Sequence, residues 1–342
     1  MPDMGIRCDV ASTVLVDGLL ATWQALPSLG EAQLAELDRN LVPREAARLR
    51  RAWLAVTAFS RVQAAVAEPL LQTLGASGID HALLKGSATS RLLYPEPYMR
   101  AGWDLDVGVR RADLRKIEAV FHDHGFVDAQ QDRESGEFHR ADPLLKAQVE
   151  ADHYELGFLV RRFEVVNLAP EVREALQSEP WARRFWFDTD GPAPRCYASV
   201  DVHHALSHDL AIEPLLASAQ RFQLPSGEVS VPNAAWLLIH LIFKIYWEGA
   251  HNYGKGLYQY ADLVRLMPSI DADTFGYVRA VLSEHRLTAA GYYVLRRLPL
   301  FELNLPDHVT SFIDETETPY ICGDPIYLND LGDMWPKLFG VR

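Results

Sequence analysis

In the stretch Asp104-Leu105-Asp106-Val107-Gly108-Val109, aspartates alternate with apolar residues. Successive side chains of a β-strand point to opposite faces, so the pattern predicts a strand with its apolar side chains on one face and both carboxylates on the other. Neighbouring carboxylates repel each other unless a cation lies between them. Oxygen ligands of this kind suit Mg²⁺, which takes further ligands from substrate phosphates. Asp104 and Asp106 are therefore candidate metal ligands, although the same tripeptide also occurs on solvated edge strands.

A second motif lies upstream, where residues 81–84 suggest a short buried strand and residues 88–94 a short helix. The turn between them contains a glycine, which lets the backbone approach a phosphate at the N-terminus of the helix. A serine in such a turn can cap the helix or bind a phosphate oxygen, and a nearby arginine can bind phosphate through two nitrogens. Four residues are therefore candidates for nucleotide binding: Lys85, Gly86, Ser87 and Arg100.

A third carboxylate is needed for a nucleotidyl transfer that uses two metal ions. Residues 199–203 again alternate, which places Asp201 and His203 on one face of a predicted strand. In this position Asp201 can bind a metal and accept the proton of an attacking hydroxyl. Glu155 is the reserve candidate for this role.

Together these motifs resemble the uncharacterised nucleotidyltransferase family of the polymerase β-like superfamily. The resemblance covers roughly residues 45–270, including the helical segments around His240 and Asp262. It implies an α+β fold, in which a polymerase β-like core of a small mixed sheet with helices is flanked by N-terminal and C-terminal helical regions. The stretches that carry it are Leu84-Lys85-Gly86-Ser87, Leu93-Tyr94-Pro95, Arg100, residues 104–109 and Val200-Asp201-Val202-His203.

The resemblance also implies an activity. Such enzymes transfer a nucleoside monophosphate from a nucleoside triphosphate, such as ATP, to an acceptor and release pyrophosphate. A small molecule or a peptide is the acceptor class that it suggests. The chain departs from the family at Trp103, where members commonly carry glycine. By position, Gly86 and Ser87 would hold the triphosphate, and Asp104, Asp106 and Asp201 would bind two Mg²⁺ ions.

Periodicity predicts three parts: an N-terminal helical region (1–75), a catalytic core (76–210) and a C-terminal helical domain (211–342). Pro43 suits the first turn of a long helix, and Pro69 should kink or restart it. A strand is expected over residues 197–203. From residue 211 onward we expect helices, of which 236–247 and 257–267 have the strongest pattern.

The net charge of −13 argues against a long nucleic acid as partner, because neutralising phosphates requires clustered Lys and Arg. The three cysteines show no CxxC spacing, which argues against a disulfide framework or a zinc finger. The sequence shows neither a signal-peptide pattern nor an apolar run long enough to span a bilayer. We therefore expect a cytoplasmic protein that binds no membrane.

Two other classes of function remain open. An Asp-x-Asp motif also holds the metal and sugar nucleotide in some glycosyltransferases. A non-catalytic nucleotide-binding or scaffold protein could keep the same fold. A kinase that moves the γ-phosphoryl group is a variant of the nucleotidyltransferase hypothesis.

Overall fold

The computed structural model describes residues 16–316, apart from residues 18, 21–22, 132–137, 179–185, 188–192, 208–209, 226, 252–256 and 302. The chain divides into two compact units, Met1–Val231 and Pro232–Arg342. The boundaries predicted near residues 75 and 210 remain predictions.

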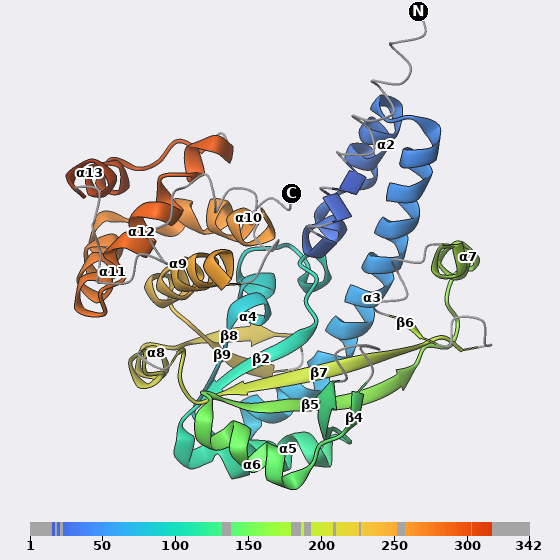
Figure 1. Cartoon of the computed structure of the whole chain (residues 1–342), viewed down its shortest axis with the longest axis horizontal. Coiled ribbons are helices and arrows are strands. Elements are labelled where there is room, and N and C mark those ends of the chain that lie inside the picture. The colour runs from blue at the N-terminus through green and yellow to red at the C-terminus, as the bar shows by residue number, and fades with distance from the viewer. Residues whose placement is uncertain are drawn as a thin grey trace, which may run out of the picture. The chain divides into compact units, whose positions relative to one another are not determined.

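The first unit is built around a mixed sheet with the strand order β1-β2-β7-β5-β3-β4, in which β6 also pairs with β7 (Figure 1). β2 and β7 are parallel, and the other pairs in this sheet are antiparallel. A mixed sheet flanked by helices confirms the predicted fold class. The strands are β1 (His81–Leu83), β2 (Asp104–Val109), β3 (Val127–Gln131), β4 (Phe138–Arg140), β5 (Glu155–Glu164), β6 (Trp186–Phe187) and β7 (Arg195–His203).

Helices flank this sheet in the first unit (Figure 1). The longest is α3, in which Pro43 occupies the first turn as predicted. The helices are η1 (Trp23–Ser28), α2 (Glu31–Asn40), α3 (Pro43–Ala76), α4 (Lys85–Leu92), η2 (Pro97–Met99), η3 (Arg111–Asp113), α5 (Leu114–Asp123), α6 (Pro143–Asp152), α7 (Pro170–Ser178) and α8 (Glu213–Ala217).

One sequence prediction about this unit is wrong, and another is settled in part. Helix α3 runs through Pro69 without a restart, because the buried side chains of Leu70, Leu71 and Leu74 pack its last turns into the core; a kink at Pro69 remains a prediction. The region after residue 211 is not all helical, because strands β8 (Gln220–Leu224) and β9 (Gly227–Val231) form an antiparallel hairpin.

The hairpin lies against the end of α3, and Gly75 makes this approach feasible. A Cβ atom at Gly75 would lie 1.8 Å from the backbone oxygen of Glu228 in β9. Only glycine therefore fits between helix and hairpin at this contact.

The two faces of the sheet differ in chemistry. One face carries Leu105 and Val200, which line a small cavity together with residues of α3 such as Ala67. In β2 and β7, Asp106 is opposite Asp201 in the parallel register, so their side chains share the other face. We call this second face the acidic face.

The described residues of the second unit form helices and the segments that join them. Helices α10, α11 and α12 all contact α9, which confirms the helices predicted over residues 236–247 and 257–267. Among the described residues, no helix combines the length and apolarity needed to cross a membrane. The helices are α9 (Ala234–His251), α10 (Leu257–Leu266), η5 (Met267–Ser269), α11 (Ala272–Glu284), α12 (Thr288–Leu295), η6 (Leu298–Phe301) and α13 (Asp307–Glu315).

Candidate active site

The parallel pairing of β2 and β7 brings two of the predicted acids together. Asp106 is opposite Asp201, and Asp104 is opposite Ser199. Both Asp106 and Asp201 are buried, with 3% and 7% of their surface exposed. A buried carboxylate is unfavourable unless a cation or several hydrogen bonds compensate for the lost water. The pair therefore needs positive charge nearby.

His203 supplies part of that charge. It lies two residues after Asp201 on β7, and its Nε2 is 3.1 Å from Asp106 Oδ1 and 3.2 Å from Asp201 Oδ2. The ligand atoms of these three residues all lie within 4.8 Å of one another, close enough to hold a metal ion. We call Asp106, Asp201 and His203 the acidic cluster.

Lys85 supplies the rest of the positive charge near the two carboxylates. Its Nζ lies 2.6 Å from Asp106 Oδ1, 3.7 Å from Asp201 Oδ2 and 3.0 Å from His203 Nε2. Lys85 is the first residue of α4, and its φ of 44° is in the left-handed region, which costs a non-glycine residue about 1–2 kcal/mol. This turn from β1 into α4 brings the ammonium into the acidic cluster.

Opposite charges in and beside the cluster stabilise one another. Burial alone would raise the pKa of Asp106 and Asp201, but Lys85 and His203 together hold the pKa of both carboxyls below its usual value. Burial opposes charge on Lys85, yet the carboxylates raise its pKa well above its usual value. Burial and the Lys85 ammonium oppose protonation of His203, and the two carboxylates outweigh them and raise the pKa of His203 to about 9. The carboxylates therefore stay ionised at neutral pH.

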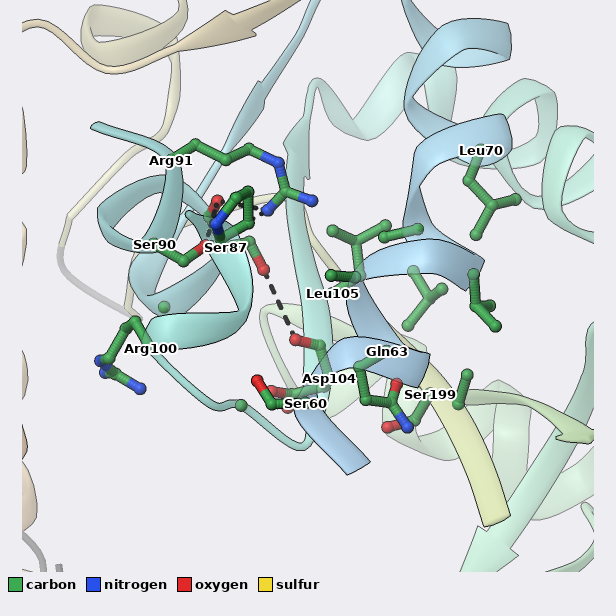
Figure 2. Close-up of a pocket in the computed structure, with 18 of the residues that line it drawn as sticks. Ser60, Gln63, Leu70, Ser87, Ser90, Arg91, Arg100, Asp104, Leu105 and Ser199 are labelled. Carbon is green, nitrogen blue, oxygen red and sulfur yellow. Dashed lines mark hydrogen bonds between the residues drawn. The ribbon is translucent and has the colours of Figure 1, made fainter. Parts of the chain in front are cut away.

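Asp104 and Ser87 lie where β2 meets α4. The Ser87 hydroxyl accepts a hydrogen bond of 2.8 Å from the backbone N–H of Asp106 and lies 3.5 Å from the backbone oxygen of Asp104 (Figure 2). Helix α4 begins earlier than predicted, at Lys85, with Leu84 as its N-cap, so Ser87 does not cap the helix. Its hydroxyl instead ties α4 to the acid-bearing strand. Asp104 is half-buried and also contributes to the raised pKa of Lys85.

Gly86 and Arg100 lie beside each other, since a Cβ atom at Gly86 would lie 3.5 Å from Arg100 Nη1. Both line a cavity of about 60 Å³ that also includes Asp104, and Figure 2 shows the Arg100 side chain extending away from Asp104. Arg100 is buried, and its Nη1 donates to the backbone oxygen of Ala101 over 2.6 Å. Such a cavity has room for a few water molecules but not for a nucleotide.

Glu155, the reserve third acid, occupies a different position. Its Oε1 lies 3.3 Å from His203 Nδ1, on the opposite side of the imidazole ring from Asp106 and Asp201. Glu155 thus orients the histidine, whereas Asp201 faces Asp106 directly. The geometry favours Asp201 as the third acid.

Trp103, which stands where the family commonly has glycine, packs against the N-terminal helices. Its ring lies 5.4 Å from that of Trp23 and 6.0 Å from that of Phe59, edge to face in both cases. Its backbone oxygen accepts a hydrogen bond of 2.9 Å from Ser199 Oγ. Trp103 therefore anchors the start of β2 and leaves the carboxylates in place.

A second acidic group, Glu118 with His122 and Asp128, is a network of ion pairs. Lys146 contacts both Glu118 and Asp128, the latter at 2.6 Å. Arg115 also pairs with Glu118 at 2.8 Å. Since the chain's own cations already compensate these carboxylates, we assign no metal to them.

The two acids beside a Gly-Ser helix on a mixed sheet agree with the comparison to known families. The chain belongs to the uncharacterised nucleotidyltransferase family, whose model matches residues 19–301. Membership indicates an enzyme of the nucleotidyltransferase kind with a nucleoside triphosphate as substrate. No curated protein matches the chain.

Sequence reasoning did not foresee the central position of Lys85 and His203. Alternation along residues 199–203 did place His203 on the face of Asp201, but its contact with Asp106 depends on the pairing of β2 with β7. The ammonium of Lys85 was expected at a phosphate rather than at the acids. No local pattern signals its left-handed backbone.

Proposed function

We propose that the chain is a metal-dependent nucleotidyltransferase that moves a nucleoside monophosphate from a nucleoside triphosphate to a small-molecule or peptide acceptor. The observation that carries the proposal is the juxtaposition of Asp106 and Asp201 on parallel strands beside the first turn of α4. Carboxylates on one strand face, next to unpaired helical N–H groups, suit a cation and a phosphate at the same point.

The residues present fit Mg²⁺. Asp104, Asp106 and Asp201 offer hard oxygen ligands, and the buried pair already attracts two positive groups of this chain, Lys85 and His203. When bound there, two Mg²⁺ ions would neutralise charge on the reacting phosphate and on the oxygens that enter and leave. Lys85 and His203 could then contact phosphate oxygens.

In the proposed reaction the acceptor hydroxyl oxygen attacks the α-phosphorus. The bond between that phosphorus and the bridging oxygen of the β-phosphate breaks, and pyrophosphate leaves with the electron pair. Asp201 receives the hydroxyl proton and passes it to solvent. The first-turn amides of α4 at Gly86 and Ser87 would bind the triphosphate, and Arg100 lies beside that turn.

The test measures binding and product together. The protein is incubated with each nucleoside triphosphate and Mg²⁺, and pyrophosphate and nucleoside diphosphate are quantified. We expect pyrophosphate from at least one nucleotide and metal-dependent binding of its α,β-methylene analogue. Diphosphate as product would instead assign a kinase. Failure to bind any nucleotide, with or without metal, would favour the glycosyltransferase or scaffold alternatives.

We expect Asp104→Asn and Asp106→Asn to reduce pyrophosphate release to background, because each removes a charged metal ligand. The matched control is Asp113→Asn, which alters a half-buried acid paired with Lys116 and should keep wild-type turnover. Full activity in Asp106→Asn would reject the metal site.

The identity of the third acid has its own test. Asp201→Asn should lose at least 100-fold in turnover, the lower end of what proton transfer contributes. Glu155→Gln, which removes the carboxylate that faces His203 Nδ1 rather than Asp106, should lose much less. If Glu155→Gln is the inactive variant and Asp201→Asn is active, the assignment must be reversed.

A further inference from the structure

The acidic face continues past Asp201 to the far edge of the sheet. Phe158 in β5 is opposite Asp201, Ala129 in β3 is opposite Phe158, and Arg140 in β4 is opposite Ala129. Residues opposite one another in register share a face. A strip of side chains therefore runs from the acidic cluster across β5 and β3 to β4.

Three rings gather on this strip, and we call Phe138, Phe158 and Tyr197 the aromatic patch. The Phe138 ring lies 5.5 Å from that of Phe158 and 5.1 Å from that of Tyr197, edge to face in both cases. Phe158 is 39% exposed although it neighbours a buried aspartate. An exposed phenylalanine beside a reactive centre offers its ring to a ligand rather than to the core.

Positive charge borders the patch. The Arg162 guanidinium lies 5.6 Å from the centre of the Tyr197 ring, and its Nη2 donates to the Tyr197 hydroxyl over 3.2 Å. Arg140 and Arg162 are both exposed. These two guanidiniums favour an anionic group above the rings.

Phe158 lines a hollow of about 390 Å³ together with Glu155 and Asp201, and the other two rings of the patch and both arginines line a neighbouring hollow of about 550 Å³. Among the described residues that line the larger hollow, the carboxylate of Asp128 is already paired with Lys146 at 2.6 Å. Both hollows fall in the range of small-molecule sites, about 300–1,000 Å³. They can therefore hold a ligand with a ring and a charged group.

We propose that this strip is the acceptor subsite, and that the acceptor carries a planar aromatic ring and an anionic group beside the hydroxyl that attacks. The assignment rests on the proposed function. Strand order supports it, because α4 contacts β2 on one side of the acids while β5 lies on the other side, next to β7. A triphosphate held at the first turn of α4 leaves the β5 side to the acceptor.

The probe is 6-hydroxy-2-naphthoate, a fluorescent compound with ring, carboxylate and hydroxyl. It is titrated against the full-length protein without nucleotide or metal. We expect saturable binding that weakens about tenfold in Phe158→Ala, which removes stacking, and in Arg162→Gln, which removes charge pairing. Neutral 2-naphthol should bind more weakly and should not respond to Arg162→Gln.

Two controls make the loss specific. Tyr277→Ala removes a ring that is also exposed, at 46%, from the second unit and should bind the probe as the wild type does. Phe158→Leu keeps apolar bulk without a ring, so it separates stacking from packing and should also weaken binding. A melting temperature of Phe158→Leu equal to that of the wild type would show that its fold is intact.

Several outcomes would overturn the proposal. One is equal probe affinity in the wild type, Phe158→Ala and Tyr277→Ala. Another is competition by MgATP together with a lower ATP affinity of Phe158→Ala, which would make the patch a nucleobase site. A third is a dimer that Phe158→Ala converts to monomer, which would make it an interface.

The failure of this inference can be told apart from that of the proposed function. Probe binding needs neither metal nor nucleotide, so Asp106→Asn should retain it. Pyrophosphate release without probe binding would remove the acceptor subsite and keep the activity. Probe binding without release of pyrophosphate from any nucleotide would remove the activity and keep only a binding site.

Discussion

Lys85 places a positive charge of the chain itself between the acids. A divalent ion bound by Asp106 and Asp201 must displace its ammonium, which lies 2.6 Å from Asp106 Oδ1. We therefore expect Lys85→Met to bind Mn²⁺ at least tenfold more tightly in the absence of nucleotide, as measured by electron paramagnetic resonance. Without metal, the variant should lose about 3–5 kcal/mol of unfolding free energy, because two buried carboxylates lose a cation.

The matched control for this prediction is Lys116→Met. Lys116 Nζ lies 2.6 Å from Asp113 Oδ1, but its side chain is 69% exposed. Surface pairs contribute about 0–1 kcal/mol, so its melting temperature and Mn²⁺ affinity should barely change. Weaker Mn²⁺ binding by Lys85→Met would show that the lysine supports the metal rather than competes with it.

At the scale of elements, the contact of α3 with β9 depends on Gly75, which has no side chain. We expect Gly75→Ala to lower the unfolding free energy by more than the roughly 1–3 kcal/mol of ordinary overpacking, because the clash is with the backbone of Glu228. Urea denaturation measures the change. Gly276→Ala in α11 is the control: its Cβ meets nothing within 4 Å, so it should gain about 1 kcal/mol. A neutral Gly75→Ala would contradict the packing of hairpin and helix.

The elements also show how far the sequence could predict the fold. The alternation of aspartates with apolar residues was enough to predict β2 at residues 104–109, because successive side chains of a strand point to opposite faces. The proximity of Asp201 to Asp106 depends on the strand order, which brings together residues far apart in the chain. The hairpin of β8 and β9 was missed because its strands are short and mostly polar, and its place is set by packing on α3 and β1.

At the scale of the whole molecule, net charge restricts the acceptor. A chain with net charge −13 repels a polyanion, and the exposed guanidiniums of Arg140 and Arg162 form a local feature of a single hollow. We expect labelled duplex DNA of 30 base pairs to bind with a dissociation constant no tighter than about 10⁻⁴ M at 0.15 M salt, the weak limit of non-specific binding. Fluorescence anisotropy over a salt series measures it.

A single-stranded RNA 20-mer is the sharper arm of the same experiment, because its bases could stack on the aromatic patch while arginines contact its phosphates. If the acceptor is a small molecule, RNA should bind as weakly as the duplex. Phe158→Ala should then leave the affinity for RNA unchanged. Submicromolar RNA binding that falls steeply with salt and is lost in Phe158→Ala would show the opposite. The rings beside Asp201 would then hold the end of a nucleic acid, and charge at the site, rather than over the whole chain, would determine the partner.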